Sequence, residues 1–355
     1  MRAAKGPYAT GGHMNKQLIV LVTGTAVVPP EARNLITDRG FALREVTDDH
    51  VGAEDLHAAL DGVSGYLIGG YEEPEPTHFE RAVTLEAVAF VGTDFRSYVP
   101  GWHTAYDLGI AFANTPGENA ASVAEFTVLL ALALARPFTA AIVRTPHSPA
   151  DPISTASPPE GRELGGRTLG VVGAGRIGAR VATIAQGLGM SVLYTSPRRN
   201  QALEAATGIA YTDLDGLLSR SDVISLHRPG PTADEPPILG RRELAICKDG
   251  ALLVNTGHHD LIDPVALAWA VEHRSLRAAV DGLGPGDAWA ALTALGPERF
   301  LSVPQMGFLT RDAGLRAGLR AARAVCDVLS GTGSPDVTNP DFRERRAAVR
   351  HGGGE

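Results

Sequence analysis

The chain has 355 residues, of which 44% are hydrophobic and 20% are charged, a composition typical of folded domains with large apolar cores. Its length predicts roughly two domains, and its apolar content excludes a mostly disordered, collagen-like or disulfide-stapled protein. The net charge of −8 argues against nucleic-acid binding and anionic-membrane binding, because both need a dense positive surface. The two cysteines, Cys247 and Cys326, lie far apart without a partner motif, so we expect a reducing, cytoplasmic compartment.

No segment indicates membrane targeting. The longest apolar runs are interrupted by Glu, Arg or Thr before they reach the length of a membrane span. Residues 1–13 lack the apolar core of a signal peptide, and Gly12-His13-Met14 resembles a cloning junction. We therefore expect residues 1–13 to be a tag or disordered, and we leave them out of the fold.

The first part of the chain alternates compact apolar runs with helical patterns. Continuous apolar runs of this length are typical of strands buried on both faces of a parallel sheet. Strands are expected at 17–22, 41–46, 64–69 and 86–92, with helices at 31–39 and around Phe79-Glu80-Arg81. The alternation predicts a doubly wound parallel α/β fold.

A long helix and a second series of the same kind follow. The helix is expected from Ser122 to about Arg136, with Asn119 or Ser122 as its cap, and the Pro- and Ser-rich stretch 145–159 reads as a linker. Further strands are expected near 168–172, 191–195, 222–226, 251–254 and 278–281. A final helix is expected at about 312–329, and the tail from Gly331 is expected to be polar and rich in turns.

A glycine motif predicts a dinucleotide site. The strand Leu169-Gly170-Val171-Val172 leads into Gly173-Ala174-Gly175-Arg176-Ile177-Gly178, and an amphipathic helix and a second strand follow. In such a motif the first glycine permits a tight turn, the second admits the pyrophosphate, and the third lets helix and strand pack closely. The helix N-terminus then offers free N–H groups to the phosphates. The alternative is a glycine turn in a Rossmann-like domain that has lost its ligand.

The segment after the second strand bears on the choice of cofactor. An NAD site usually carries Asp or Glu there, to accept a hydrogen bond from the ribose 2′-hydroxyl. This chain has Thr195-Ser196-Pro197-Arg198-Arg199 and no carboxylate. Because Ser196, Arg198 and Arg199 would bind a 2′-phosphate through charge-assisted hydrogen bonds, the segment favours NADP(H) over NAD(H). NAD(H) stays open, since the two arginines can also form a solvated surface pair.

Several further segments, taken in order, resemble the D-isomer-specific 2-hydroxyacid dehydrogenases, a family that includes phosphoglycerate, glycerate, formate and D-lactate dehydrogenases. The resemblance covers nearly everything from Met14 to about Leu329. It rests on Ala113-Asn114-Thr115-Pro116-Gly117, on Ser122-Val123-Ala124-Glu125, on the run 163–170 before the glycine motif, on 221–229, and on 250–256.

The resemblance implies a Rossmann cofactor domain at 118–307, inserted into a flavodoxin-like substrate domain made of 14–117 and 308–345. It also implies a homodimer built on the helix that begins near Ser122, with a small-molecule substrate. Cofactor contacts are expected from Gly173, Gly175, Arg176, Ile177 and Gly178, from Ser196, Arg198 and Arg199, and by resemblance from His227, Thr256 and Asp281, of which Asp281 would contact the nicotinamide carboxamide.

The catalytic residues typical of this family are replaced. Members carry Arg just after an Asn-Thr pair, where His258 stands here, and His after a proline, where this chain has Gln305. The family's Glu position holds Gly286, with Asp287 next to it. Gln305 can donate a hydrogen bond but is no acid, and His258 titrates near neutrality without the two-pronged grip of Arg. We therefore expect His258, Gln305, His259 and Asp287 to be the candidate catalytic residues, with Tyr98 as a further residue to test.

Other candidates have plain structural alternatives. Arg96 and Thr93, in the loop after a substrate-domain strand, are candidates for substrate binding, although Arg96 is equally compatible with a surface pair with Asp94. We expect no metal at His258-His259, because neighbouring residues of an extended chain point to opposite sides and no other ligand cluster supports one. His227 fits a buried structural role equally well. Trp289 and Met306 are candidates for the pocket lining, with core packing as the default for both.

Three functions remain open from the sequence. The first is a nicotinamide-dependent oxidoreductase with a rebuilt substrate site, in which His258 acts as acid and base, Gln305 orients the reacting group and Arg96 binds an anion. The second is a lyase, hydratase or isomerase that retains the nicotinamide without net redox change. The third is a catalytically inactive dinucleotide sensor. Because the motifs for cofactor binding are intact, the sequence favours the first.

Overall fold

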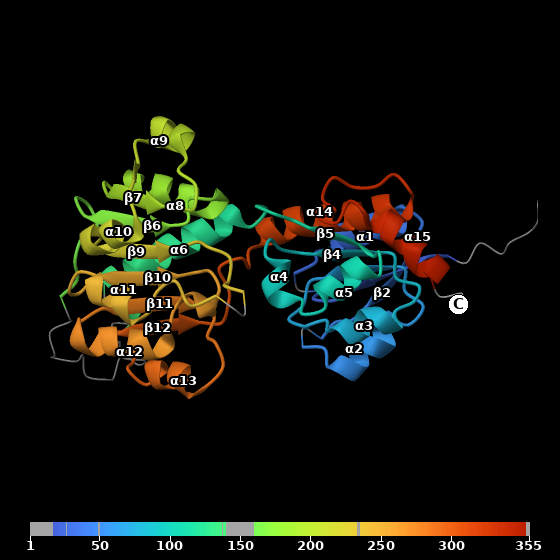
Figure 1. Cartoon of the computed structure of the whole chain (residues 1–355), viewed down its shortest axis with the longest axis horizontal. Helices are drawn as coiled ribbons and strands as arrows, with labels where there is room; N and C mark the ends of the chain where they lie inside the picture. Colours follow the sequence, from blue (N-terminus) through green and yellow to red (C-terminus); the bar gives the residue numbers. More distant parts are fainter. Residues whose placement is uncertain are drawn as a thin grey trace, which may run out of the picture. The chain divides into compact units, whose positions relative to one another are not determined.

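The computed structural model describes residues 17–25, 27–48, 50–136, 138–139, 160–232 and 235–352 (Figure 1). The tag expected at 1–13 and the linker expected at 145–159 lie outside these residues. The chain divides into two compact units, and each is described by itself below. The first unit consists of Met1–Val91, Pro100–Asn114 and Gly318–Glu355, and the second consists of Gly92–Val99 and Thr115–Ala317. Each unit contains a parallel sheet with helices, which confirms the predicted α/β class.

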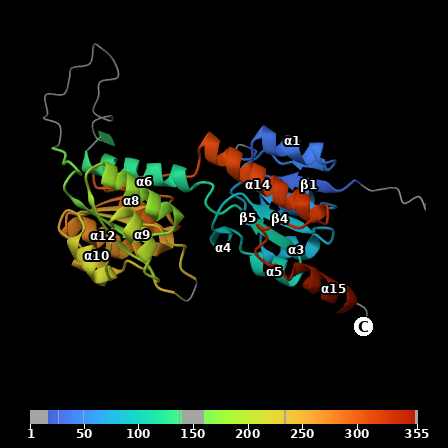
Figure 2. The same cartoon turned by 90° about the horizontal axis from the view of Figure 1, so that it is seen from above.

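The first unit has a five-stranded parallel sheet in the order β2-β1-β3-β4-β5, which is the flavodoxin-like order. Figure 2 shows α1 and α14 on one face of this sheet and α3 and α5 on the other. The strands and helices of the unit are β1 (Ile19–Val22), α1 (Pro30–Asp38), β2 (Ala42–Glu45), α2 (Ala53–Leu60), β3 (Gly65–Ile68), α3 (Pro76–Arg81), β4 (Ala87–Phe90), α5 (Trp102–Asp107), β5 (Ala111–Asn114), the part of α14 (Arg311–Leu329) from Gly318 onward, and α15 (Phe342–Gly352).

The second unit has a seven-stranded parallel sheet in the order β12-β11-β10-β9-β6-β7-β8. Figure 1 shows most of these strands stacked in this order. The order reverses between β6 and β9, so these two strands flank the point where doubly wound sheets bind ligands. The elements are α4 (Phe95–Tyr98), α6 (Ala120–Ala135), β6 (Thr168–Val172), α8 (Arg176–Gly187), β7 (Ser191–Thr195), α9 (Gln201–Thr207), β8 (Ala210–Tyr211), α10 (Leu214–Arg220), β9 (Val223–Leu226), α11 (Arg241–Ile246), β10 (Leu252–Asn255), the 3₁₀ helix η1 (His259–Leu261), α12 (Pro264–His273), β11 (Arg277–Asp281), α13 (Asp287–Thr293) and β12 (Phe300–Val303).

Alternate residues of the central strands serve two separate cores in the second unit. In β10, Leu253 packs with side chains of α10, α11, α12 and α13, while Val254 packs with side chains of α6 and α8. Because strand side chains alternate between faces, a continuous apolar run is what a sheet covered on both sides requires. Burial on both faces holds the strand ends, and the loops that follow them, in fixed positions.

The structure differs from the sequence prediction in a few elements. The tail expected to be rich in turns contains the helix α15. That helix is held by polar contacts rather than by an apolar stripe, since Arg345 pairs with Asp341 and Asp107 and Arg346 donates to the carbonyl of Leu85. In addition, α8 begins at Arg176, inside the glycine motif rather than at Ala179 after it, and β5, β8 and β12 were not predicted. Within the described ranges, every helix is too short or too polar to cross a membrane.

Candidate functional site

The glycine loop between β6 and α8 forms an open cradle. Gly173 has a φ of 101°, and a Cβ there would lie 2.4 Å from the carbonyl oxygen of His227. A Cβ on Gly178 would lie 2.1 Å from the carbonyl oxygen of Gly173, so this helix and strand pack too closely for a side chain. A Cβ on Gly175 would meet no atom within 4 Å. The first and third glycines are thus sterically required, and open space lies over the second, as a pyrophosphate needs.

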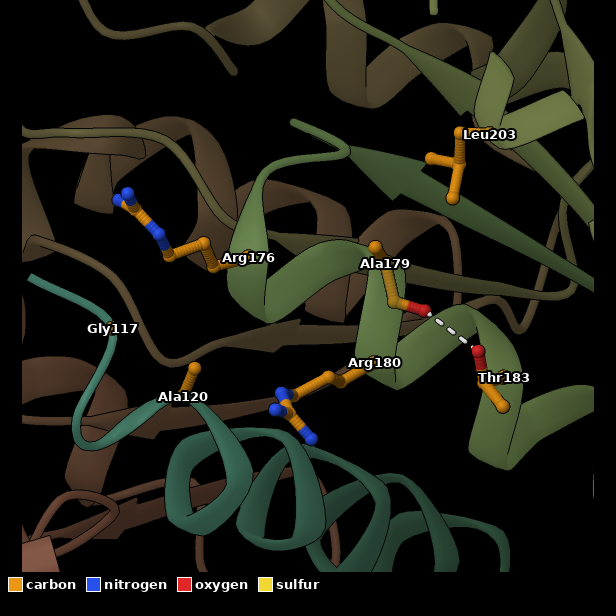
Figure 3. Close-up of a pocket in the computed structure, with 7 residues that line it drawn as sticks. All are labelled: Gly117, Ala120, Arg176, Ala179, Arg180, Thr183 and Leu203. Atoms are coloured by element: carbon orange, nitrogen blue, oxygen red, sulfur yellow. Dashed lines mark hydrogen bonds between the residues drawn. The ribbon is translucent and has the colours of Figure 1, made fainter. Parts of the chain in front are cut away.

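A cavity of about 370 Å³ flanks the start of α8 (Figure 3). Arg176 and Arg180 lie four residues apart on α8, and both guanidinium groups are exposed. None of the lining residues carries a carboxylate, so the cavity has a positive character. The sequence analysis did not predict that Arg180 lines this cavity. Its spacing of four residues from Arg176 could have indicated that the two side chains lie on the same face of the helix. The lining residues are Gly117, Ala120, Arg176, Ala179, Arg180, Thr183 and Leu203.

The segment after β7 lies beside the glycine loop. The half-buried Ser196 accepts a hydrogen bond through Oγ from the backbone N–H of Ala174, at 3.0 Å. Arg199 donates to both carboxylate oxygens of Glu204, at 2.8 and 2.7 Å, and these bonds hold the pKa of Glu204 down at about 2. Arg198 is exposed and makes no ion pair within the described part of the chain. Of the two predicted arginines, Arg198 is therefore the one with its guanidinium uncommitted.

Three other predicted cofactor residues lie at strand ends of the same sheet. Asp281 is buried at the end of β11, and its two oxygens accept backbone N–H bonds from Met306 and Gly307, at 2.7 and 2.8 Å. Burial raises the pKa of Asp281, while these two bonds lower it. Thr256 shares a 2.9 Å hydroxyl–hydroxyl bond with a threonine of α6. His227 follows β9, and burial lowers its pKa to about 3, so its imidazole stays neutral.

His258 lies in the turn after β10. Asn255, at the end of that strand, is buried and shapes the turn by donating through Nδ2 to the carbonyl of His258 at 2.9 Å. The ring of His258 packs on Gly230, where a Cβ would lie 2.9 Å from Cγ. Burial is the main cause that lowers the pKa of His258, and the neighbouring His259 lowers it further. His258 is therefore a neutral imidazole at neutral pH.

His258 and His259 lie together, contrary to the expectation that they point to opposite sides. Their ring centroids are 4.2 Å apart. The reason is that the chain is not extended here: His258 is the N-cap of η1, and its Nδ1 accepts the backbone N–H of Asp260 at 3.3 Å. The Nδ1 of His259 donates to Oδ1 of Asp260 at 2.8 Å. One atom able to bind a metal in each of His258, His259 and Asp260 lies within 4.8 Å of the corresponding atoms in the other two. These hydrogen bonds account for the grouping, and we assign no metal to it.

Gln305 and Tyr98 form a second polar pair in the same unit. Gln305 donates through Nε2 to the hydroxyl oxygen of Tyr98 at 2.8 Å. The ring of Tyr98 meets that of His258 edge to face, with centroids 5.8 Å apart. Burial, together with the charge of Asp94, raises the pKa of Tyr98 to about 12, so its hydroxyl keeps its proton. Gln305 has a φ of 52°, an uncommon left-handed conformation for a residue other than glycine. The structure therefore brings Gln305, Tyr98 and the two histidines into one cluster.

The remaining predicted residues lie elsewhere in the same unit. Asp287 is exposed in the first turn of α13, where a carboxylate stabilises the positive end of the helix dipole. Arg96 is exposed, with its guanidinium 5.6 Å from the ring centroid of Phe95. The Oγ1 of Thr93 accepts the backbone N–H of Gly117 at 3.3 Å. Trp289 is buried in one core of the second unit and Met306 is partly exposed.

Comparison with known proteins places the chain among nicotinamide-dependent enzymes. Residues 128–299 match a family model described as D-isomer specific 2-hydroxyacid dehydrogenase, NAD binding domain. A glyoxylate reductase of Aeropyrum pernix is 34% identical over 275 residues, which cover 73% of this chain and 76% of that relative. A hydroxypyruvate reductase of Thermotoga maritima is 30% identical over 284 residues, covering 79% and 90%. Among solved structures, the TT0316 protein of Thermus thermophilus is 28% identical with a TM-score of 0.75, covering 90% of this chain and 100% of that one.

Proposed function

Since this chain belongs to the D-isomer-specific 2-hydroxyacid dehydrogenase family, we propose that it is a nicotinamide-dependent oxidoreductase with a non-standard substrate. The observation that carries the proposal is the glycine cradle at the point where the strand order reverses between β6 and β9. Gly173 and Gly178 are each required by a neighbouring backbone atom, while the space over Gly175 is open. This combination is the one that a bound pyrophosphate needs.

The bound nicotinamide would supply hydride transfer to or from a carbon that carries oxygen. The glycine loop and the N-terminus of α8 would hold its phosphates, with Arg176 beside them, and Asp281 would hold the carboxamide end. Proton transfer to or from the substrate oxygen falls to the imidazoles His258 and His259. The imidazole of histidine is the usual general base at neutral pH, because it exchanges a proton in that pH range. Gln305 is an amide, so its part is to orient the reacting group.

The substrate is proposed to differ from an ordinary 2-hydroxy acid. The family's Arg binds a substrate carboxylate through two parallel hydrogen bonds, and an imidazole at position 258 has no such fork. Arg96 is the proposed replacement for the anion contact, because it is an exposed cation in the same structural unit as His258. Thr93, in the same loop, is proposed as a second substrate contact. Phosphonates, aldehydes and ring carbonyls all remain compatible with such a site.

NADP(H) is the proposed cofactor. The uncommitted guanidinium of Arg198 and the hydroxyl of Ser196 support this choice, because both can donate to a 2′-phosphate. Arg199 contributes less directly, since Glu204 occupies its two-pronged donor edge. No carboxylate stands at the end of β7 to accept a ribose hydroxyl, although such a residue is usual in NAD sites.

A homodimer is proposed for the whole molecule. The helix α6 is apolar on nearly every side, and its large side chains Leu129 and Leu132 are 53% and 37% exposed. Phe138, shortly after the helix, is 58% exposed. A helix that is apolar on all sides is normally buried, so the exposed side of α6 indicates a contact with a partner. A second copy of this chain is the proposed partner.

A cofactor stoichiometry assay tests the proposed function. The chain is incubated with NADPH and with a panel of 2-oxo acids, aldehydes, oxophosphonates and cyclic ketones, and both reduced nicotinamide and product are quantified. We expect one NADPH oxidised per product molecule for at least one compound, and feeble turnover of glyoxylate, pyruvate and hydroxypyruvate. Product formed without net cofactor oxidation would instead indicate a lyase, hydratase or isomerase. Tight cofactor binding without turnover of any compound would indicate a sensor. Efficient reduction of the three ordinary 2-oxo acids would contradict the proposed change of substrate.

A further inference from the structure

Asp260 contacts both histidines of the cluster: its carboxylate lies 2.8 Å from Nδ1 of His259 (Oδ1) and 3.5 Å from Nδ1 of His258 (Oδ2), and its backbone N–H also reaches Nδ1 of His258. Its backbone N–H donates to Nδ1 of His258, at 3.3 Å. Its carboxylate oxygen Oδ1 accepts from Nδ1 of His259, at 2.8 Å. A neutral imidazole carries one hydrogen, so each of these contacts fixes which ring nitrogen bears it.

The two contacts give the imidazoles opposite tautomers. Because Nδ1 of His258 accepts, the hydrogen of that ring is on Nε2, where it is a donor. Because Nδ1 of His259 donates to a carboxylate, its Nε2 carries a lone pair and is an acceptor. The cluster therefore offers a hydrogen-bond donor and a base side by side, with ring centroids 4.2 Å apart.

Gly284 and Trp289 also restrict the position of His259. A Cβ on Gly284 would lie 2.7 Å from Nδ1 of His259 and 2.5 Å from Nε1 of Trp289. The rings of His259 and Trp289 meet edge to face, with centroids 6.3 Å apart. Both contacts are with rigid rings rather than with the end of a flexible side chain. The position of His259 therefore depends on glycine at residue 284.

We propose that Asp260 and His259 form the carboxylate–imidazole pair that carries the proton in this site, while His258 hydrogen-bonds the substrate oxygen. This inference rests on the proposed oxidoreductase function. Asp260 acts as a positioning residue, and Gly284 provides the space. The pair would stand in for the Glu and His that the sequence lacks at positions 286 and 305, on a turn of the chain that follows a different strand.

The step balances in either direction. In oxidation the substrate O–H bond breaks, its proton passes to Nε2 of His259, and its C–H hydrogen leaves with the electron pair for the bound oxidised nicotinamide as the C=O bond forms. The imidazolium that results faces the carboxylate of Asp260, which stabilises its charge. Reduction is the reverse, with the proton returning from His259.

The first test observes tautomers in the full chain without cofactor. Long-range ¹H–¹⁵N spectra of the imidazoles at neutral pH should show the hydrogen of His259 on Nδ1 and that of His258 on Nε2. In Asp260→Ala the fixed Nδ1–H tautomer of His259 should be lost. An Nε2–H tautomer of His259 in the unchanged protein would overturn the assignment whether or not the protein is an oxidoreductase.

The second test uses turnover with the substrate found in the stoichiometry assay. His259→Gln is expected to lower kcat about a hundredfold, and Asp260→Ala to lower it about tenfold or more. Asp260→Glu should restore part of that loss, and the cofactor dissociation constant should not move. Asp260→Ala should also move the pH inflection of turnover downward, because a charge that favours the imidazolium is gone. Among the described residues, His258 and Tyr98 of the cluster and the nearby carboxylates Asp94 and Asp281 also titrate, and all four remain in this variant.

Matched variants distinguish a displaced His259 from general damage to the protein. Gly284→Ala should reduce turnover as Asp260→Ala does, while Gly187→Ala, at a site where a Cβ meets no atom, should not. Glu272→Gln, an exposed carboxylate on α12, should leave both turnover and its pH profile unchanged. If His258→Ala impairs turnover while His259→Gln and Asp260→Ala do not, the pair is wrong and the proposed function stands. If no compound is turned over with cofactor oxidation, the proposed function fails, and the tautomer spectra still test the pair.

Discussion

His258 is half-buried between Tyr98, the backbone of Gly230 and His259. Desolvation and the neighbouring imidazole lower its pKa, while the carboxylates of Asp260 and Asp94 act in the opposite sense with smaller effect. The neutral form therefore persists to lower pH than it does for a solvent-exposed histidine. In its neutral form His258 can donate a hydrogen bond to the substrate oxygen without placing a positive charge beside His259, the proposed proton acceptor.

This environment predicts opposite pH profiles for the two reaction directions. Oxidation needs neutral imidazoles, so its kcat/KM should rise with pH through an inflection and reach a plateau, and His258, whose pKa is lowered, should be mostly neutral at the ordinary histidine value of 6.5. Reduction needs the protonated pair, so its rate should fall as pH rises through the same inflection. Steady-state rates in both directions, measured with the NADP(H) couple, check the prediction. An oxidation rate that falls as pH rises would contradict proton transfer to a histidine.

Two substitutions of His258 test whether its hydrogen bond alone supports turnover. His258→Ala should lower turnover about a hundredfold and leave cofactor affinity nearly unchanged, because the cofactor is held by the glycine loop. His258→Gln retains an N–H donor and should retain more of the activity than His258→Ala. The values of kcat and the cofactor dissociation constant decide the outcome. An unchanged kcat in His258→Ala would place this residue outside the chemistry.

The residues of the cluster show what sequence alone could and could not establish. The resemblance predicts that three catalytic residues of the family are replaced, and this prediction identifies His258 and Gln305 as candidates. Asp260 was not a candidate because a charged loop residue is usually solvated, as its 57% exposed side chain is, and its contacts with the histidines depend on the turn of η1. The bond between Gln305 and Tyr98 joins residues 207 positions apart, which only the fold brings together.

At the scale of elements, strands of the sheet interiors were predictable and several edge strands were not. The ranges expected for β6 and β7 agree with the structure, because β6 is a nearly continuous buried run and β7 carries buried apolar residues at alternate positions. The strands β5, β8 and β12 were missed, and each lies at an edge of its sheet. An edge strand is defined by its pairing with one neighbour rather than by its own pattern. In β8 both residues, Ala210 and Tyr211, are exposed.

The β7–α9 segment predicts cofactor selectivity. NADP(H) should bind at least tenfold more tightly than NAD(H), a difference of about 1.4 kcal/mol or more. Arg198→Ala should remove most of this preference, whereas Arg199→Ala should act mainly by freeing Glu204 and loosening the start of α9. NAD(H) binding should change little in Arg198→Ala, which makes it the internal control. Titration calorimetry with both cofactors provides the affinities, and equal or reversed values in the unchanged protein would refute the NADP(H) assignment.

At the scale of the whole molecule, the chain should be a dimer built on α6. Light scattering coupled to gel filtration should give twice the mass of one chain. Leu129→Glu should shift the mass toward a single chain, because it places a charge in an apolar contact. Val265→Glu is the matched control, since Val265 is 66% exposed on α12, a helix outside the proposed contact. A monomer in the unchanged protein would contradict the proposed dimer without affecting the cofactor site.

The central claim is that this chain moves hydride between a nicotinamide and its substrate with a rebuilt proton relay. The most direct measurement follows the hydride itself. NADPH deuterated at the transferred position of its nicotinamide ring is supplied with the compound that the stoichiometry assay selects, and the product is analysed by mass spectrometry. The account predicts one deuterium on the former carbonyl carbon of each product molecule. Product without deuterium, formed while the labelled cofactor remains reduced, would contradict it.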